Sequence, residues 1–169
     1  GGLFDVRGRT ALVTGASAGI GAMIAEGLVC AGARVWICSR KQADIEQMGE
    51  RLGAWGECHA IAADVSSEEG IDSVQATLSQ SSGTLDILVN NAGTSWAAPL
   101  DQYPRAGFEK VFNLNLVAPF VLTQALLPSL RRAASRDYPA KVINIASIDG
   151  MRPPELDTFA YSASKAGLI

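Results

Sequence analysis

Residues 11–21 read ALVTGASAGIG, and this stretch decides the fold. The apolar run at 11–13 predicts a buried strand, and Thr14-Gly15 begins a turn directly after it. Helix-forming residues follow over 20–31, and Gly32 stands where a helix commonly ends in a left-handed residue. The sequence therefore predicts a strand, a tight turn and a helix in direct succession.

The glycines of this turn suit it to a phosphate ligand. Free N–H groups and the positive end of the helix dipole attract a pyrophosphate at a helix N-terminus, provided that no side chain blocks its approach. The glycine spacing differs from the commoner G-x-G-x-x-G, and a purely structural turn is the alternative. The position between strand and helix favours dinucleotide binding. The predicted contacts are Gly15, Ser17, Gly19, Ile20 and Gly21.

The same alternation of strand and helix continues along the chain. Further strands are predicted at 34–38, 60–63, 85–89 and 141–145, and further helices at 42–52, 67–78, 108–132 and from about Thr158 onward. Pro119 predicts a kink in the longest helix. Because the strands are continuously apolar, they belong in a parallel sheet covered on both faces. Right-handed crossovers then give one α/β domain over residues 1–169, a Rossmann-type doubly wound sheet in the order 3-2-1-4-5.

The second and third strands end in residues that can select a cofactor. NAD-binding folds commonly present an Asp or Glu to the adenosine ribose there, but this chain has Ser39-Arg40. Ser39 can hydrogen-bond a 2′-phosphate and Arg40 can bind it through a charge-assisted fork, which predicts NADP(H). A solvated arginine in a turn is the alternative. Asp64 and Val65 are placed to meet the adenine, although an Asp that opens a turn is equally expected as a cap.

Composition argues against several other classes of protein. The 169 residues are 48% hydrophobic with a formal net charge of -3, which excludes a disordered chain and disfavours nucleic acid as a partner. No uninterrupted apolar run approaches the roughly 18 residues of a membrane helix, and the start lacks a secretory leader pattern. Cys30, Cys38 and Cys58 form no C-x-x-C pair, and His59 is the sole histidine. We therefore expect a cytoplasmic protein with reduced cysteines, no metal and no membrane partner.

Polar residues gather at the ends of the fourth and fifth strands. Residues 90–93 read NNAG at the edge where ligands bind in such sheets, and Ser147 follows the fifth strand. Tyr161 and Lys165 are four residues apart and share one face of a predicted helix. Free tyrosine has a pKa of about 10, and a neighbouring ammonium favours the phenolate. Each motif alone has a structural explanation, but the combination indicates an active site.

Together these motifs resemble the short-chain dehydrogenase/reductase family over essentially the whole chain. The family's glycine motif, NNAG sequence, serine and Tyr-x-x-x-Lys all stand here in order. The resemblance adds a helix asparagine, Asn115 in the sequence NLNL, and implies that it positions a water molecule. It implies that Tyr161 is the general acid and that Lys165 assists it and holds the nicotinamide ribose. Ser147 would donate a hydrogen bond to the carbonyl oxygen of the substrate.

The resemblance also implies a reaction. Among subgroups the chain is most similar to bacterial 3-oxoacyl-(acyl-carrier-protein) reductases of the rhamnolipid-associated kind, from NAGTSW at 91–96 and LLPSLRR at 126–132. This similarity implies an NADPH-dependent ketone reductase, with a 3-oxoacyl thioester as the favoured substrate, that forms a homo-oligomer, either a dimer or a tetramer. A steroid, a sugar or another alcohol or ketone is the alternative substrate, and a non-catalytic dinucleotide-binding module is the alternative function. Further cofactor contacts are implied for Asn91, Ala92, Gly93, Tyr161 and Lys165.

The chain departs from the family in two places. Many NADP-using relatives carry Arg or Lys in the glycine loop where this chain has Ala18, so Arg40 is expected to set the cofactor preference alone. The family also continues with two more strands and a loop that covers the substrate, so we expect the chain to be truncated within its last helix. Candidate walls of the substrate pocket, each at least as well explained by packing, are Trp96, Met151, Pro153 and Pro154.

Overall fold

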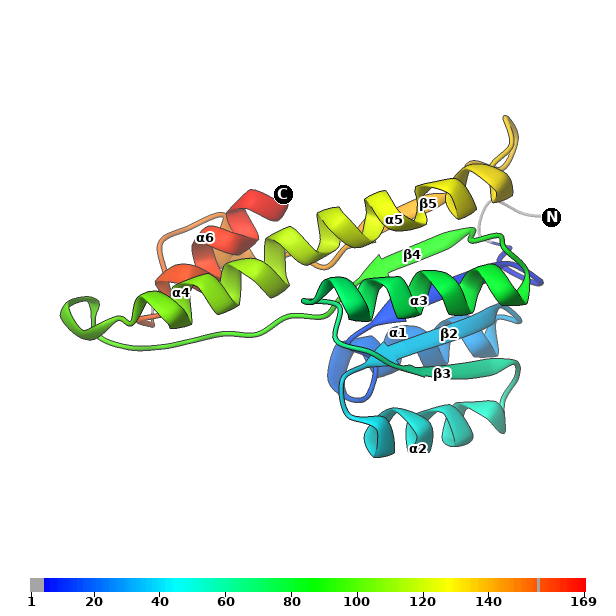
Figure 1. The fold of residues 1–169 in the computed structure, drawn as a ribbon, viewed down its shortest axis with the longest axis horizontal. Coiled ribbons are helices and arrows are strands. Elements are labelled where there is room, and N and C mark those ends of the chain that lie inside the picture. The colour runs from blue at the N-terminus through cyan, green and yellow to red at the C-terminus, as the bar shows by residue number, and fades with distance from the viewer. Residues whose placement is uncertain (1–4, 155) are drawn as a thin grey trace.

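A parallel sheet organises the computed structural model, which describes residues 5–154 and 156–169. Within these residues it has five strands in the order β3-β2-β1-β4-β5 (Figure 1). They are β1 (Thr10–Thr14), β2 (Arg34–Ser39), β3 (Cys58–Ala62), β4 (Ile87–Asn90) and β5 (Lys141–Asn144). Every pairing is parallel; Val13 of β1, for example, lies between Ile37 of β2 and Val89 of β4. The predicted Rossmann-type sheet and its strand order are confirmed.

Helices cover both faces of the sheet, as Figure 1 shows. One core contains Val13 and Val89 of the sheet together with buried residues of α1 (Gly19–Cys30) and α2 (Gln42–Gly53). The other contains Leu12 and Leu88 together with buried residues of α3 (Glu68–Ser81) and α5 (Ala118–Ala133). Successive strand residues point to opposite faces, so Leu12 and Val13 enter different cores. This explains why the strands are apolar without alternation.

The longest helical stretch is interrupted in its middle. It consists of α4 (Arg105–Phe112), a π-helical turn η2 (Asn113–Val117) and α5. Pro119 has no N–H with which to complete the usual helical bond to the carbonyl of Asn115 four residues earlier, so the regular α-helix cannot continue unchanged there. The predicted irregularity at Pro119 therefore takes the form of a π turn, and the helix begins at Arg105 rather than near 108.

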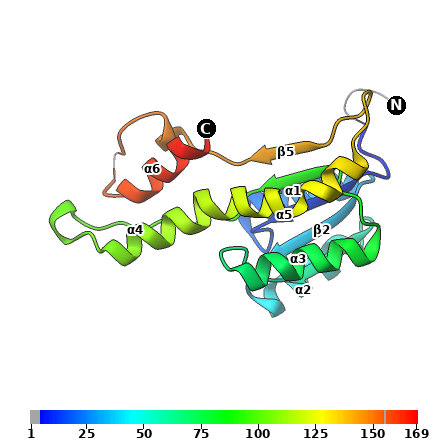
Figure 2. The same ribbon diagram turned by 45° about the horizontal axis from the view of Figure 1, so that its top comes forward.

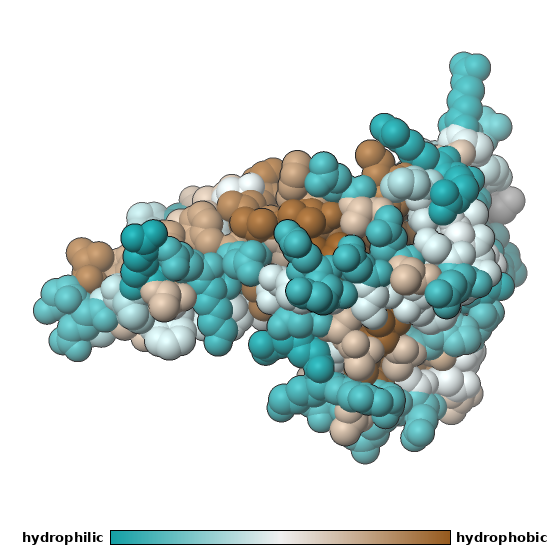
Figure 3. Space-filling model, in the orientation of Figure 1, coloured by the Kyte–Doolittle hydropathy of each residue, from teal (hydrophilic) through white to brown (hydrophobic). Residues whose placement is uncertain are grey.

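This long helix also meets the length and hydropathy requirements for crossing a membrane. Arg105–Ala133 has 29 residues and contains an 18-residue window of mean hydropathy 1.5. A core helix satisfies the same requirements, so a single example is weak support for a membrane span. Leu122, Leu126 and Leu130 of this helix are buried in the core beside α3. Phe120 remains exposed, and Figure 3 shows a hydrophobic patch over α5.

The last part of the described chain lies apart from the main sheet. One short 3-10 turn, η1 (Leu100–Gln102), precedes α4, and a second, η3 (Ile148–Gly150), lies between β5 and α6 (Phe159–Leu168). Figures 1 and 2 show α6 beside the α4 end of the long helix rather than over the sheet centre. The edge strand β5 is exposed along its whole length. The carboxyl ends of the strands and the start of α6 thus meet at one side of the molecule.

Candidate active site

The loop between β1 and α1 leaves its backbone open to a ligand. Gly15 and Gly19 have positive φ angles of 65° and 59°, which L side chains rarely adopt. A side chain at Gly19 would meet nothing within 4 Å and would therefore project into open space beside the loop. Ala18 is the N-cap of α1 and supplies no side-chain cap, so the first-turn N–H groups have no side-chain acceptor there. This start of a helix fits a pyrophosphate, with Ile20 exposed beside it.

Thr14 and Asn91 fasten this loop to the end of β4. The Asn91 side-chain amide donates to the Thr14 carbonyl at 2.9 Å and the Gly15 carbonyl at 3.1 Å. The Thr14 hydroxyl accepts from the backbone N–H groups of Asn91 at 3.1 Å and Ala92 at 3.0 Å. Asn91 was predicted as a cofactor contact, which stays a prediction; in the structure its side-chain amide binds the loop backbone. Thr14 was not among the predicted site residues, although a polar residue ending an apolar strand signals such a role. Gly21 completes the packing, because a side chain there would collide with the Asn91 amide.

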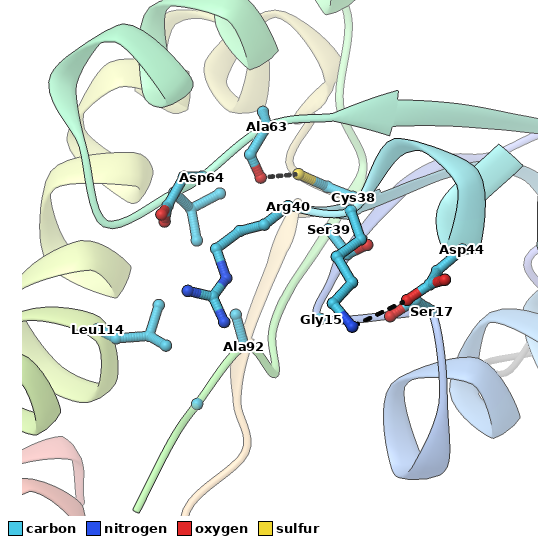
Figure 4. Close-up of a pocket in the computed structure, with 13 residues that line it drawn as sticks. Gly15, Ser17, Cys38, Ser39, Arg40, Asp44, Ala63, Asp64, Ala92 and Leu114 are labelled. Carbon is cyan, nitrogen blue, oxygen red and sulfur yellow. Dashed lines mark hydrogen bonds and ion pairs between the residues drawn. The ribbon is translucent and has the colours of Figure 1, made fainter.

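A cleft of about 290 Å³ opens at the carboxyl ends of the strands (Figure 4). Its lining brings together these predicted cofactor residues: Gly15, Ser17, Ser39, Arg40, Asp64, Val65, Ala92 and Gly93. Gly19, Ile20 and Gly21 are outside this lining, at the start of α1. The lining also includes Lys41, Asp44 and Leu114, which the sequence analysis did not select.

The end of the cleft at Ser39 and Arg40 fits a phosphorylated ligand. The Ser39 hydroxyl is buried and has no hydrogen-bond partner among the described residues. Figure 4 shows the Arg40 side chain extending across the cleft. A buried hydroxyl without a partner costs stability unless something completes its hydrogen bond. A 2′-phosphate would supply both an acceptor for Ser39 and a counter-charge for Arg40.

Asp64 serves the turn as well as the cleft. Its Oδ1 accepts from the Ser66 N–H at 3.0 Å and from the Ser66 hydroxyl at 2.6 Å. Partial burial raises the pKa of the Asp64 carboxyl, but the hydrogen bonds from Ser66 and the charge of Arg40 outweigh it and leave the pKa below its ordinary value. The side chain is therefore an anion that caps the turn after β3 while its residue lines the cleft. The cap interpretation is therefore confirmed, and the contact with the adenine stays a prediction.

Gly93 joins the cleft to the predicted catalytic residues. It lines the cleft, and a side chain there would lie 3.3 Å from Asn115 Oδ1 and 3.8 Å from Lys165 Nζ. Lys165 is 5% exposed and its ammonium donates to the Ile145 carbonyl at 2.6 Å. Burial lowers the pKa of this lysine. The ammonium group is therefore held at the inner end of the cleft, with its charge incompletely solvated.

Asn115 is held by three hydrogen bonds. Its Oδ1 accepts from the Thr94 N–H at 2.8 Å, and its Nδ2 donates to the Thr94 carbonyl at 2.9 Å. The second Nδ2 hydrogen goes to the Ser164 hydroxyl at 3.0 Å, and Ser164 in turn donates to the Tyr161 carbonyl at 2.8 Å. The side chain of Asn115 thus ties the loop after β4 to the helix that carries Tyr161 and Lys165. Ser164 was missed by the sequence analysis, which considered only the tyrosine and lysine of that helix.

Tyr161 and Ser147 border the same region from α6 and η3. Tyr161 is half-buried, and its ring centroid lies 5.8 Å from Lys165 Nζ. Ser147 is also half-buried, and its hydroxyl accepts from the Asp149 N–H at 3.2 Å, so that it caps the η3 turn. Gly150 of that turn lies against the backbone of Lys165, because a side chain there would approach it to 2.7 Å. The turn that carries Ser147 therefore packs directly on the helix that carries Tyr161.

The remaining candidates have packing roles or lie at the surface. The Trp96 ring lies against Gly107 of α4, and its carbonyl accepts from the Tyr103 hydroxyl at 3.0 Å. Met151 and Pro153 are exposed, and Pro154 is half-buried. His59 stacks on Trp36 with ring centroids 4.5 Å apart and faces Glu57 on the surface. Over residues 5–154 and 156–169, no group of three His, Cys, Asp or Glu side chains could hold a metal ion.

Comparison with known families decides the assignment of the chain. The pattern of the short chain dehydrogenase family matches residues 9–169. The chain belongs to this family. A rhamnolipids biosynthesis 3-oxoacyl-[acyl-carrier-protein] reductase of Pseudomonas aeruginosa is 52% identical over 165 residues, which are 98% of this chain and 64% of that protein. The ketoacyl reductase HetN of a Nostoc species is 36% identical over 163 residues, 96% of this chain and 55% of that protein.

Solved structures of short chain dehydrogenases have the same fold. The Pseudomonas aeruginosa RhlG/NADP active-site complex superposes with a TM-score of 0.94 at 52% identity, covering 98% of this chain and 64% of that one. The present chain therefore spans less than two thirds of the length of these relatives. The matched regions cover nearly the whole of this chain.

Proposed function

We propose that the protein is an NADP(H)-dependent oxidoreductase that reduces a ketone to a secondary alcohol. The observation that carries this proposal is the position of Gly93, which lines the dinucleotide cleft and lies against both Asn115 and Lys165. A cofactor in the cleft would therefore end beside the residues suited to proton transfer. A module that only bound a dinucleotide would not need a buried lysine and a fully hydrogen-bonded asparagine at that point.

The choice of NADP(H) over NAD(H) rests on the end of β2. Ser39 and Arg40 stand where an NAD-binding fold would present an acidic residue, and the buried Ser39 hydroxyl lacks a partner among the described residues. A 2′-phosphate would satisfy the hydroxyl and pair with the guanidinium. The NADP in the complex with the 52% identical relative supports the same choice.

The chain's own residues would orient the substrate and move one proton. NADPH, when bound, supplies the hydride that adds to the carbonyl carbon. Tyr161 donates its phenolic proton to the carbonyl oxygen, while Ser147 donates a hydrogen bond to the same oxygen. The ammonium of Lys165 stabilises the negative charge that remains on the phenol oxygen. Asn115 holds the helix of Tyr161 in place through Ser164. It would also position a water molecule that connects Lys165 with solvent, so that Lys165 passes a proton to the Tyr161 phenolate and regains one from the water.

A 3-oxoacyl thioester is the proposed substrate. The names of the two relatives, a 3-oxoacyl-[acyl-carrier-protein] reductase and a ketoacyl reductase, support this substrate class. A steroid or sugar ketone is the alternative. The experiment is a panel of ketones, with loss of NADPH absorbance as the measurement, on the wild type and on Tyr161→Phe. Tyr138→Phe is the matched control, because Tyr138 is an exposed tyrosine that packs on Arg9 away from the cleft.

The expected outcome is turnover of the acyl thioester that Tyr161→Phe lowers about 10²- to 10⁴-fold and Tyr138→Phe leaves unchanged. Turnover of another ketone class alone would reject the substrate but keep the reaction. NADPH binding without turnover of any carbonyl would instead favour the dinucleotide-binding module. Near-wild-type turnover in Tyr161→Phe would reject the role of that tyrosine.

The proposal includes a homo-oligomer, a dimer or tetramer, that acts in the cytoplasm. Phe120 on α5 is 69% exposed, and a groove of about 460 Å³ between α5, β5 and α6 is lined mostly by apolar residues. Apolar surface of this kind supports self-association. Unpaired thiols at Cys30, Cys38 and Cys58 support a reducing compartment. Sedimentation equilibrium would measure the assembly, and a monomer at all concentrations would reject that part of the proposal.

A further inference from the structure

The cofactor cleft contains a second basic side chain besides Arg40. Lys41 also lines the cleft. It is the residue immediately before α2 and is not part of the glycine loop. Its Nζ lies 3.7 Å from the Asp44 carboxylate, which also lines the cleft. In Figure 4 Asp44 and Ser17 project toward one end of the cleft, whereas Arg40 extends toward Asp64 and Leu114. The two cations therefore approach the cleft from different directions.

The position of Lys41 is unfavourable for the helix that it precedes. It is the N-cap residue of α2, and it gives the helix no side-chain cap. Ser, Thr, Asp or Asn at this position would each stabilise the helix, whereas a cation near a helix N-terminus opposes the helix dipole. Asp44 in the first turn offsets part of that repulsion through its ion pair with Lys41. Helix stability therefore does not account for a lysine at this place.

The charge of the proposed ligand supplies a reason for it. A phosphate monoester carries about -1.5 to -2 charges at neutral pH, so Arg40 alone would leave a 2′-phosphate incompletely neutralised. Ala18 brings no cation from the glycine loop, since its side chain is a methyl group at the start of α1. Lys41 lines the cleft, and its ion-pair partner Asp44 lies near Ser17 of that loop in Figure 4. It can therefore supply the second positive charge from the other side.

We propose that Lys41 is a second residue that recognises the 2′-phosphate of NADP(H), in place of a glycine-loop cation, and that Asp44 is its counter-ion until the phosphate competes for it. This inference rests on the proposed NADP(H) function and departs from the expectation that Arg40 sets the preference alone. It assigns opposite effects to the two partners of one ion pair. Loss of Lys41 removes an attraction for the phosphate, whereas loss of the Asp44 charge removes both a competitor and a repulsion.

The test measures dissociation constants for NADPH and NADH by fluorescence titration at low and high salt, without any substrate. Lys41→Gln is expected to weaken NADPH binding about three- to tenfold at low salt and to leave NADH binding unchanged. Asp44→Asn is expected to tighten NADPH binding about twofold to threefold. Because exposed charges are screened, both effects shrink at high salt. The matched control is Lys141→Gln, which removes an exposed lysine from the amino end of β5.

Each outcome separates this inference from the proposed function. If the wild type binds NADPH no better than NADH, both the NADP(H) preference and the role of Lys41 are wrong. If the wild type prefers NADPH and Arg40→Gln removes the preference while Lys41→Gln behaves as Lys141→Gln does, only the role of Lys41 is wrong. Adding Ala18→Lys to Lys41→Gln is expected to restore the lost affinity. If Ala18→Lys does not restore the affinity and the unfolding midpoint is unchanged, the claim that Lys41 takes the place of a glycine-loop cation is wrong.

Discussion

Two buried serines on α6 allow a test of how this helix, which carries Tyr161 and Lys165, is held in place. Ser164 is fully buried, and its hydroxyl accepts from Asn115 Nδ2 at 3.0 Å and donates to the Tyr161 carbonyl at 2.8 Å. Ser162 is 8% exposed, and its hydroxyl has no hydrogen-bond partner among the residues that the structure describes. The two residues therefore differ in hydrogen bonding but hardly in burial, helix or chemistry.

Replacement of each serine by alanine should change stability in different ways. Ser164→Ala leaves one Nδ2 hydrogen of the fully buried Asn115 without an acceptor, which costs about 1 to 3 kcal/mol. Ser162→Ala removes a hydroxyl that is already unsatisfied, so the change is expected to be neutral or stabilising by up to about 1 kcal/mol. For a chain of this size a loss of about 2 kcal/mol lowers the unfolding midpoint by roughly 4 to 8 °C.

The measurement is urea unfolding of the wild type and both variants, followed by circular dichroism, together with thermal midpoints. Equal slopes against urea would show that the three proteins lose the same surface on unfolding. Equal destabilisation by the two substitutions, or a larger loss from Ser162→Ala, would refute the reasoning. In that case the cost would come from packing at α6 and not from the hydrogen bond to Asn115.

Three further predictions concern the loop, the lysine and the thiols. Gly19→Ala places a side chain at a φ of 59° and in open space beside the loop, so a strain of about 1 kcal/mol and at least about tenfold weaker NADPH binding in titrations are expected. Burial lowers the folded-state pKa of Lys165 below its unfolded value. At pH values between these two pKa values the unfolded chain binds more protons, so the free energy of unfolding rises with pH. Urea unfolding across the alkaline range should show this rise in the wild type and lose it in Lys165→Met. Burial raises the pKa of the Cys38 thiol to about 12, so peptide mapping after treatment with a thiol reagent should find the exposed Cys30 modified and Cys38 intact until the protein unfolds.

The sheet could be predicted from the sequence because its strands are buried on both faces. Runs such as Leu12-Val13 and Leu88-Val89 are apolar at every position, and only a parallel sheet covered on both sides accounts for them. The π turn at Asn113–Val117 was not predicted, since a proline shows that a helix must change without showing which change occurs. The extension of α4 to Arg105 was missed because Pro104 precedes it without any Ser, Thr or Asp cap.

Some residues of the candidate site could also be predicted from the sequence, and others could not. Residues at strand ends, such as Ser39 and Asp64, could be located from order alone, because parallel strands bring their carboxyl ends to one edge. Ser164 bonds to Asn115, which is distant from it in the chain, and Lys41 lines the cleft from the residue before a helix. The periodicity of apolar and polar residues along the sequence does not predict such contacts. Asn91 shows the converse, since its amide binds the loop backbone rather than projecting into the cleft.

The hydrogen bond from Lys165 to the Ile145 carbonyl has a consequence for the entropy of binding. A mobile lysine side chain has about 2 kcal/mol of rotamer entropy, which a ligand must overcome when it orders the chain. Here the ammonium is already held at 2.6 Å from that carbonyl, and the side chain is 5% exposed. The ordering therefore takes place during folding, and the ribose of the proposed cofactor would meet a preorganised donor at Lys165. In the proposed reaction, each turnover would begin from the same arrangement of the charge, without a search among rotamers.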